Sequence, residues 1–130
     1  MTDLINDIVD FNQMVLGIEP RETGLLSTNE YQITVNCLSE EVKEFNEAHI
    51  NDDLVGCVDA LIDGIYFAVG ALYKHGLTSD QISRCIAAVH LCNMEKKKGV
   101  NSKRDTGAAD AVKGDDWVGP EAMIKEILGV

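Results

Sequence analysis

The sequence has little proline and few clusters of turn-forming residues: only two of its 130 residues are proline. Because such residues interrupt helices, their scarcity favours a mostly helical chain, and no segment has a convincing β-strand pattern. A glycine-rich phosphate-binding loop is also absent from the sequence, so phosphate binding would need other groups. We therefore expect an all-α fold in a single domain over residues 1–130, a helical bundle of four main helices plus a short C-terminal helix.

Basic residues are scarce as well. Eleven Lys and Arg against 22 Asp and Glu give a formal net charge of −11. This charge disfavours a nucleic-acid partner or an anionic membrane, because phosphate backbones and headgroups attract cationic surfaces. A phosphorylated small molecule stays compatible with it if metal ions and a local basic cluster meet the phosphates. The sequence has neither a CxxC pair nor a signal peptide, and its four cysteines fall in expected helices, which predicts a reducing, cytoplasmic location.

Residues 54–73 form a long apolar stretch that carries only two charged residues, Asp59 and Asp63. On a helix these lie one turn apart on one face. We reject a transmembrane span, because each Asp would cost at least about 2.5 kcal/mol and no basic flank fixes an orientation. Two alternatives stay open: a core helix whose Asp residues pair with Lys or Arg, and a buried helix that offers two carboxylates to a metal ion.

The other helices are expected around this one, with Thr2 as a candidate N-cap for the first. Gly76 is expected to stop the third helix and Gly99 the fourth. Lys96 to Lys98 then fall in the last turn of the fourth helix, where they complement the helix dipole. The expected ranges are about 4–16, 28–49, 54–75, 79–98 and 122–128.

The second helix carries Glu40, Glu41 and Glu44 within one turn. Spacing of 100° per residue puts Glu41 next to the apolar seam, Glu44 farther round and Glu40 near the outer face. Taken alone, this segment favours a solvated acidic face.

The short connection at residues 51–53 makes the second and third helices antiparallel neighbours. The glutamates of the second helix and the aspartates of the third each lie about ten residues from that connection. We therefore expect them to lie side by side at the same level along the two helix axes. Such a cluster repels itself without cations, and its all-oxygen ligands suit Mg²⁺ or Mn²⁺. A metal site of this kind, together with basic residues later in the chain that stabilise phosphate charge, can hydrolyse a phosphoanhydride. The converging carboxylates are Glu40, Glu41, Glu44, Asp59 and Asp63.

At this point the chain resembles the all-α nucleoside triphosphate pyrophosphohydrolases, which are MazG-like and phosphoribosyl-ATP pyrophosphohydrolase-like. The resemblance rests on Glu-Glu-x-x-Glu at 40–44 and on the acidic pair at 59–63. It continues through further segments in the same order, at 65–70, 75–77, 89–96 and 113–120. The last of these is similar to a tail of the phosphoribosyl-ATP pyrophosphohydrolase-like branch.

The resemblance implies hydrolysis of an NTP or dNTP to the monophosphate and pyrophosphate with Mg²⁺, or Mn²⁺ as a substitute. It implies a metal site of Glu41, Glu44 and Asp63, with Glu40 as a ligand or as the residue that orients water. Many members have a Glu where this chain has Ala60, and Asp59 is then the substitute ligand. The catalytic residues are accordingly Glu40 and Glu41, and the metal ligands Glu41, Glu44, Asp59 and Asp63.

Substrate contacts follow from the same resemblance, which also implies a homodimer or homotetramer whose helices complete the site. The expected substrate-binding residues are Asn93, Lys96, Lys97 and Lys113. Trp117 either stacks on a base or pins the C-terminal loop to the helices. Two other functions stay open: hydrolysis of phosphoribosyl-ATP, and a non-catalytic helical module that binds a nucleotide or a partner, which Ala60 would support.

Overall fold

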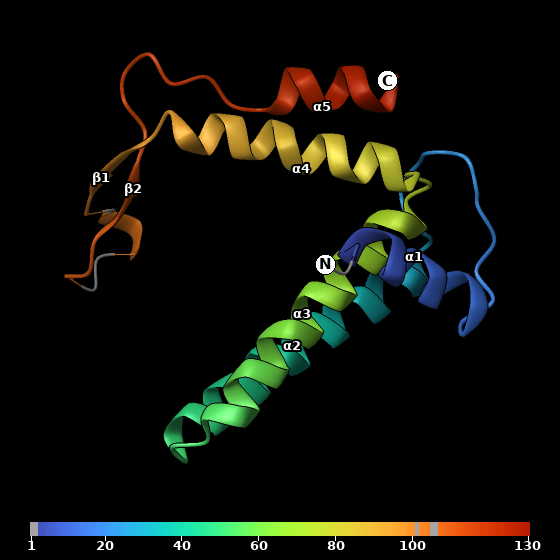
Figure 1. Cartoon of the computed structure of the whole chain (residues 1–130), viewed down its shortest axis with the longest axis horizontal. Helices are drawn as coiled ribbons and strands as arrows, with labels where there is room; N and C mark the ends of the chain where they lie inside the picture. Colours follow the sequence, from blue (N-terminus) through green and yellow to red (C-terminus); the bar gives the residue numbers. More distant parts are fainter. Residues whose placement is uncertain (1–2, 101, 105–106) are drawn as a thin grey trace. The chain divides into compact units, whose positions relative to one another are not determined.

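A computed structural model describes residues 3–100, 102–104 and 107–130. Over these residues it contains five α-helices and very little strand, so the expected all-α fold is confirmed. The helices are α1 (Leu4–Met14), α2 (Thr28–Ile50), α3 (Leu54–Lys74), α4 (Ser79–Met94) and α5 (Glu121–Leu128) (Figure 1).

The chain divides into two compact units, Met1–Ile82 and Ser83–Val130. The first unit holds α1, α2, α3 and the start of α4. The second holds the rest of α4, a small sheet and α5. A single domain over residues 1–130 stays a prediction.

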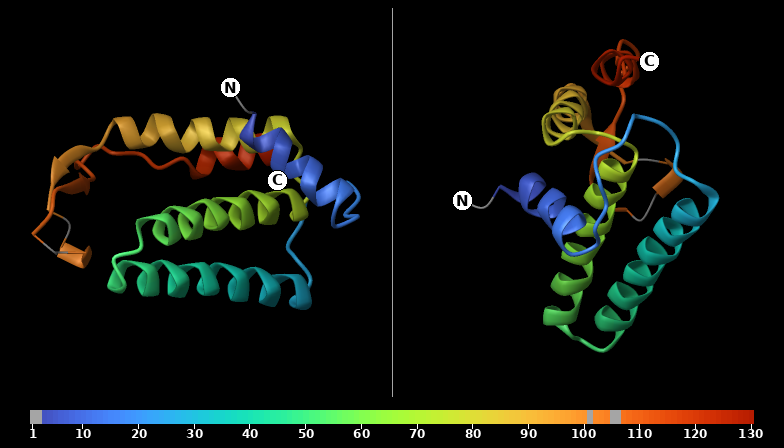
Figure 2. Two further views of the ribbon diagram at one scale, coloured as in Figure 1. Left: turned by 60° about the horizontal axis from the view of Figure 1, so that its bottom comes forward. Right: turned by 90° about the vertical axis from the view of Figure 1, so that its right-hand side faces the viewer.

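Helices α2 and α3 form an antiparallel hairpin (Figures 1 and 2). Ser27 caps α2 by accepting a hydrogen bond from the Glu30 amide at 3.2 Å. Asp53 caps α3 by accepting one from the Gly56 amide at 2.9 Å. Between the helices, Asp52 adopts a left-handed conformation with φ of 53°, which Asp tolerates better than most residues. These local signals produce the tight turn that the sequence predicts.

Helix α1 packs against α3. Ile8 is fully buried, and the rings of Phe11 and Tyr66 meet edge to face with centroids 5.3 Å apart. Asp3 is the N-cap of α1, whereas the expected cap, Thr2, lies outside the described residues. The first unit is therefore three packed helices with the α2–α3 hairpin as its frame.

Helix α3 is strongly apolar, yet only 22% of its most apolar window is buried in the single chain. Val55 is 79% exposed and Leu61 is 55% exposed. By length and composition alone α3 would qualify as a membrane-spanning helix, a criterion that core helices of soluble proteins also meet. The single chain therefore leaves a large apolar surface open on this helix.

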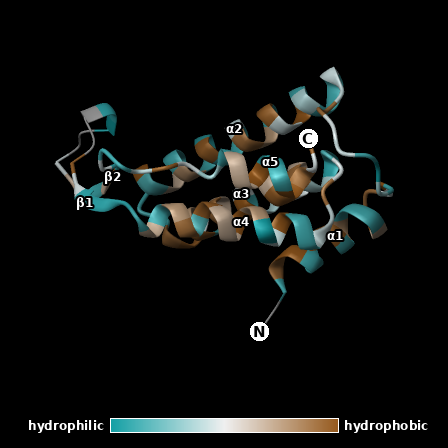
Figure 3. Cartoon of the chain, turned by 90° about the horizontal axis from the view of Figure 1, so that it is seen from above, coloured by the Kyte–Doolittle hydropathy of each residue, from teal (hydrophilic) through white to brown (hydrophobic). Residues whose placement is uncertain are grey.

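Two short strands in the second unit, β1 (Lys97–Gly99) and β2 (Asp110–Val112), pair antiparallel with Gly99 opposite Asp110. Figure 3 colours β1 as hydrophilic, in agreement with its sequence Lys-Lys-Gly. The sequence predicted no strand and a fourth helix that reaches Lys98; both predictions are wrong, since α4 ends at Met94. The backbone of residues 97–99 instead pairs with a segment that lies farther along the chain.

Candidate functional site

The predicted carboxylates come from the two helices of the hairpin. On α2, Glu41 is buried at 9% exposure, while Glu40 and Glu44 are exposed. On α3, Asp63 is partly buried and Asp59 is exposed. The position of Glu41 beside the apolar seam accounts for its burial.

The pKa of Glu41 is raised to about 7 from its ordinary value of 4.5. Burial is the largest cause, because it penalises the charged carboxylate. A side-chain hydrogen bond with Glu44 and repulsion from Glu44, Asp63 and Glu40 raise it further. The structure thus brings together carboxylates from both helices around Glu41, and Asp59 is not among the main contributors.

One oxygen of Glu41, Oε2, is buried without a hydrogen-bond partner among the described residues. A buried carboxylate oxygen beside three other acidic groups is surrounded by negative charge. It is stabilised by a positive charge placed near it. Such hard oxygen donors are the kind that Mg²⁺ and Mn²⁺ prefer. In the part of the chain that the structure describes, no three His, Cys, Asp or Glu side chains already have a metal-holding arrangement. The donors therefore suit a divalent cation in their chemistry, and binding would require their side chains to draw together.

Ala60 is the position for which the resemblance implies a Glu in many family members. It is only 2% exposed and belongs to the core of the first unit. The neighbouring Asp59 points to solvent, because a step of one residue turns the side chain by about 100° around the helix. The small residue at this position serves packing in the single chain.

The predicted substrate-binding residues all lie in the second unit. Lys96 and Lys113 place their ammonium groups 5.1 Å and 4.7 Å from the centroid of the Trp117 ring. These are cation–π distances, so the indole holds both lysines at one place. The Trp117 indole N–H also donates a hydrogen bond to the Cys92 carbonyl at 2.7 Å. Trp117 therefore pins the C-terminal loop to the end of α4, one of its two predicted roles.

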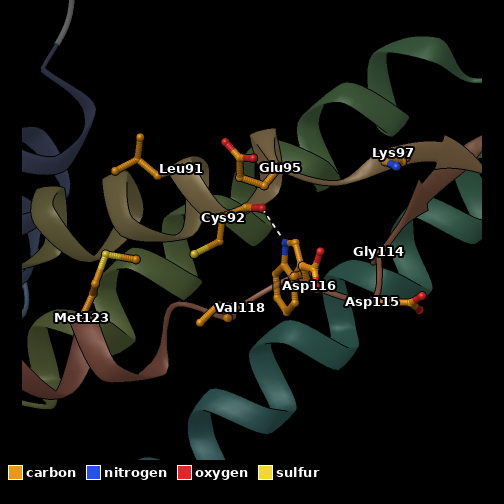
Figure 4. A pocket seen from close by; sticks show the side chains of 11 residues that line it. Leu91, Cys92, Glu95, Lys97, Gly114, Asp115, Asp116, Val118 and Met123 are labelled. Carbon is orange, nitrogen blue, oxygen red and sulfur yellow. Dashed lines mark hydrogen bonds between the residues drawn. The ribbon is translucent and has the colours of Figure 1, made fainter.

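Lys97 lies on β1, and Asn93 is exposed in the last turn of α4. Lys97 lines an open cavity of about 550 Å³, together with Trp117, Asp115 and Asp116 (Figure 4). Sequence reasoning missed this cavity, because its walls come from residues 91–97 and 114–123, which only folding brings together.

A family model for phosphoribosyl-ATP pyrophosphohydrolases matches residues 18–91, more than half of the chain. The match contains α2 and α3 with all five acidic residues and ends before Asn93. No curated protein matches the chain.

Proposed function

The chain belongs to the phosphoribosyl-ATP pyrophosphohydrolase family, within the MazG-like superfamily, and we propose that it hydrolyses a nucleoside triphosphate to the monophosphate and pyrophosphate. The family's activity is hydrolysis at a phosphoanhydride bond. The observation that carries the proposal is the buried Glu41, which has an unpartnered oxygen and stands beside Glu40, Glu44 and Asp63.

We assign the divalent cation, Mg²⁺ or Mn²⁺, to Glu41, Glu44 and Asp63, with Asp59 as a further ligand after rotation of its side chain. When bound, the cation neutralises phosphate oxygens and activates water for attack. Because the carboxylates repel one another in its absence, positive charge at this place also relieves their repulsion.

Glu40, exposed at the edge of the cluster, orients the attacking water and accepts its proton. The oxygen of the water bonds to the α-phosphorus as the bond from that phosphorus to the bridging oxygen breaks. The products are the nucleoside monophosphate and pyrophosphate. Asn93, Lys96, Lys97 and Lys113 are proposed to bind the sugar and to offset the phosphate charge.

The test is to incubate the protein with each common NTP and dNTP, with Mg²⁺ and with EDTA, and to quantify pyrophosphate and orthophosphate separately. We expect pyrophosphate and monophosphate in the presence of metal only. Glu44→Gln and Asp63→Asn should each lower kcat/KM at least about 100-fold while the far-UV circular dichroism spectrum is unchanged. Glu47→Gln, an exposed acid on the same helix, is the matched control and should stay active.

Two results would contradict this proposal. Orthophosphate with diphosphate would indicate a different phosphoanhydride cleavage at the same metal site. Full activity in both Glu44→Gln and Asp63→Asn would remove the carboxylates from the mechanism.

A second candidate substrate is phosphoribosyl-ATP, which the description of the matching family favours. It contains the same triphosphate, so the same carboxylates would serve. Adding it to the substrate panel decides between the two: a kcat/KM far above that for every common nucleotide would make it the substrate.

We also propose that the protein acts as a homodimer or homotetramer in the cytoplasm. The support for assembly is the exposed apolar surface of α3, including Val58, Leu61 and Ile65. Such a surface favours burial against another chain.

A further inference from the structure

The first unit contains a second, more closed cavity of about 300 Å³ between α1, α2 and α3. Its walls are mostly apolar and aromatic, with Phe11 from α1 and Tyr66 and Phe67 from α3. Flat apolar walls of this kind suit an aromatic heterocycle, which stacks on aromatic side chains.

The cavity adjoins the carboxylate cluster along the hairpin. Cys37, on its α2 wall, lies one turn before Glu41, and Tyr66 and Phe67 lie one turn after Asp63. Because α2 and α3 run antiparallel (Figure 2), both walls lead from the cavity to the acidic side chains within about 6 Å along the helix axes. A nucleotide whose phosphates meet the carboxylates can thus place its base in this cavity.

Asn12 is a buried polar group of the cavity that the mechanism leaves unused; Thr34 and Lys74 also line the cavity. It is 3% exposed and lines the cavity. Its side-chain Nδ2 donates to the Ile8 carbonyl at 2.9 Å, which fixes the orientation of the carboxamide. The carboxamide has a second N–H and the Oδ1 oxygen in addition to the N–H that makes this bond. A buried carboxamide on a cavity wall can offer both a donor and an acceptor to a ligand.

Gly70 on α3 makes room for this carboxamide. A Cβ at position 70 would lie 3.0 Å from Nδ2 of Asn12 and 3.4 Å from its Oδ1. Glycine at this buried position therefore lets the backbone of α3 come close to the amide, and a larger residue would displace the amide within the cavity.

We infer that this cavity binds the nucleobase of the substrate and that Asn12 is the residue that selects the base. The inference rests on the proposed nucleotide hydrolysis, and it deepens it by naming a specificity-determining side chain. The carboxamide offers a donor beside an acceptor, which pairs with the hydrogen-bonding edge of a base. A site that hydrogen-bonds its ligand discriminates strongly against ligands that leave those groups unpaired.

The first part of the test is base preference, measured as kcat/KM on each common NTP and dNTP. Asn12→Leu keeps the approximate volume but removes both hydrogen-bonding groups, and should lower kcat/KM for the preferred base about 10- to 100-fold. The kcat/KM for nucleotides with the other bases should fall less, so the difference in kcat/KM between bases should become smaller. Asn12→Asp replaces the donor with an acceptor and should reorder the preference, and Gly70→Ala should weaken it. Gln13→Leu, at an exposed position on the same helix, is the control and should keep the wild-type preference.

The second part uses the wild-type protein without metal or phosphates, so that the pocket is tested apart from hydrolysis. The side-chain ¹⁵N–¹H signals of Asn12 should shift on titration with the nucleoside of the preferred base. Unchanged preference in Asn12→Leu, or an Asn12 amide that does not respond to any nucleoside, would overturn the inference and leave hydrolysis standing. A nucleoside-dependent shift in a protein that hydrolyses no nucleotide would instead overturn the proposed function and support the pocket.

Discussion

The residue on which the candidate site depends is Glu41. Its position beside the apolar seam of α2 was readable from the spacing of the sequence, and its burial agrees with that spacing. The spacing could not show that Asp63 rather than Asp59 is the nearer acid on α3, because both lie on one face of an ideal helix. Nor could it identify Asn12, since a lone Asn in an amphipathic helix carries no signal of burial.

The raised pKa of Glu41 has a consequence for stability in the metal-free protein. A folded-state pKa of about 7, above the ordinary 4.5, means that the folded state holds this proton more tightly than the unfolded state does. The free energy of unfolding therefore falls as the pH rises from about 4.5 through about 7. Glu41→Gln removes this titration, so the variant should be more stable than the wild type at pH 8 and similar to it at pH 4.

Urea denaturation in EDTA at a series of pH values measures this difference. Glu47→Gln changes the same kind of residue at an exposed position of α2 and is the control variant. A gap between Glu41→Gln and the wild type that stays constant from pH 4 to pH 8 would mean that the burial of Glu41 does not perturb its titration.

At the scale of elements, the helices were predictable because each carries its own periodicity and caps. The β1–β2 hairpin was not, since its strands are only three residues long, lack apolar alternation and pair across ten intervening residues. At Gly99 a Cβ would lie 2.9 Å from Cγ2 of Val112, so the glycine expected to stop a helix serves close strand pairing instead. Local sequence shows neither the partner strand nor this contact.

Gly76, the predicted stop of α3, has a second role that only the fold reveals. Its φ is +91°, and a Cβ there would overlap the carbonyl of Glu22 and lie 2.7 Å from the Thr23 nitrogen. The Gly24 amide donates to the His75 carbonyl at 2.9 Å, which holds the loop of residues 15–27 against this end of α3.

Gly76→Ala should therefore lower the free energy of unfolding by about 1 to 3 kcal/mol, through backbone strain and collision together. Gly24→Ala is the matched control at the same junction: a Cβ at Gly24 meets nothing within 4 Å, so its effect should stay within about 0.5 kcal/mol. Urea denaturation at neutral pH compares the two. Equal stabilities would show that the loop yields without cost.

At the scale of the whole molecule, the sequence of α3 is typical of a buried helix, but a single chain buries only 22% of its most apolar window. The family match includes all of α3, and the proposed assembly would bury this apolar surface against another copy. A single sequence cannot show what covers this surface, because an apolar pattern predicts burial without identifying the group that buries it.

Assembly through α3 predicts that a charge on its open apolar surface separates the copies. Leu61→Lys should raise the dissociation constant of the assembly at least about tenfold, because its ammonium group would be buried between the copies without a partner. A tenfold change corresponds to about 1.4 kcal/mol of association free energy. Met14→Lys, at an 81% exposed position on α1, is the control and should leave assembly unchanged. Sedimentation velocity over a range of concentrations measures the shift. A wild-type protein that stays monomeric throughout would reject assembly, and one that needs detergent to stay in solution would return α3 to the membrane interpretation.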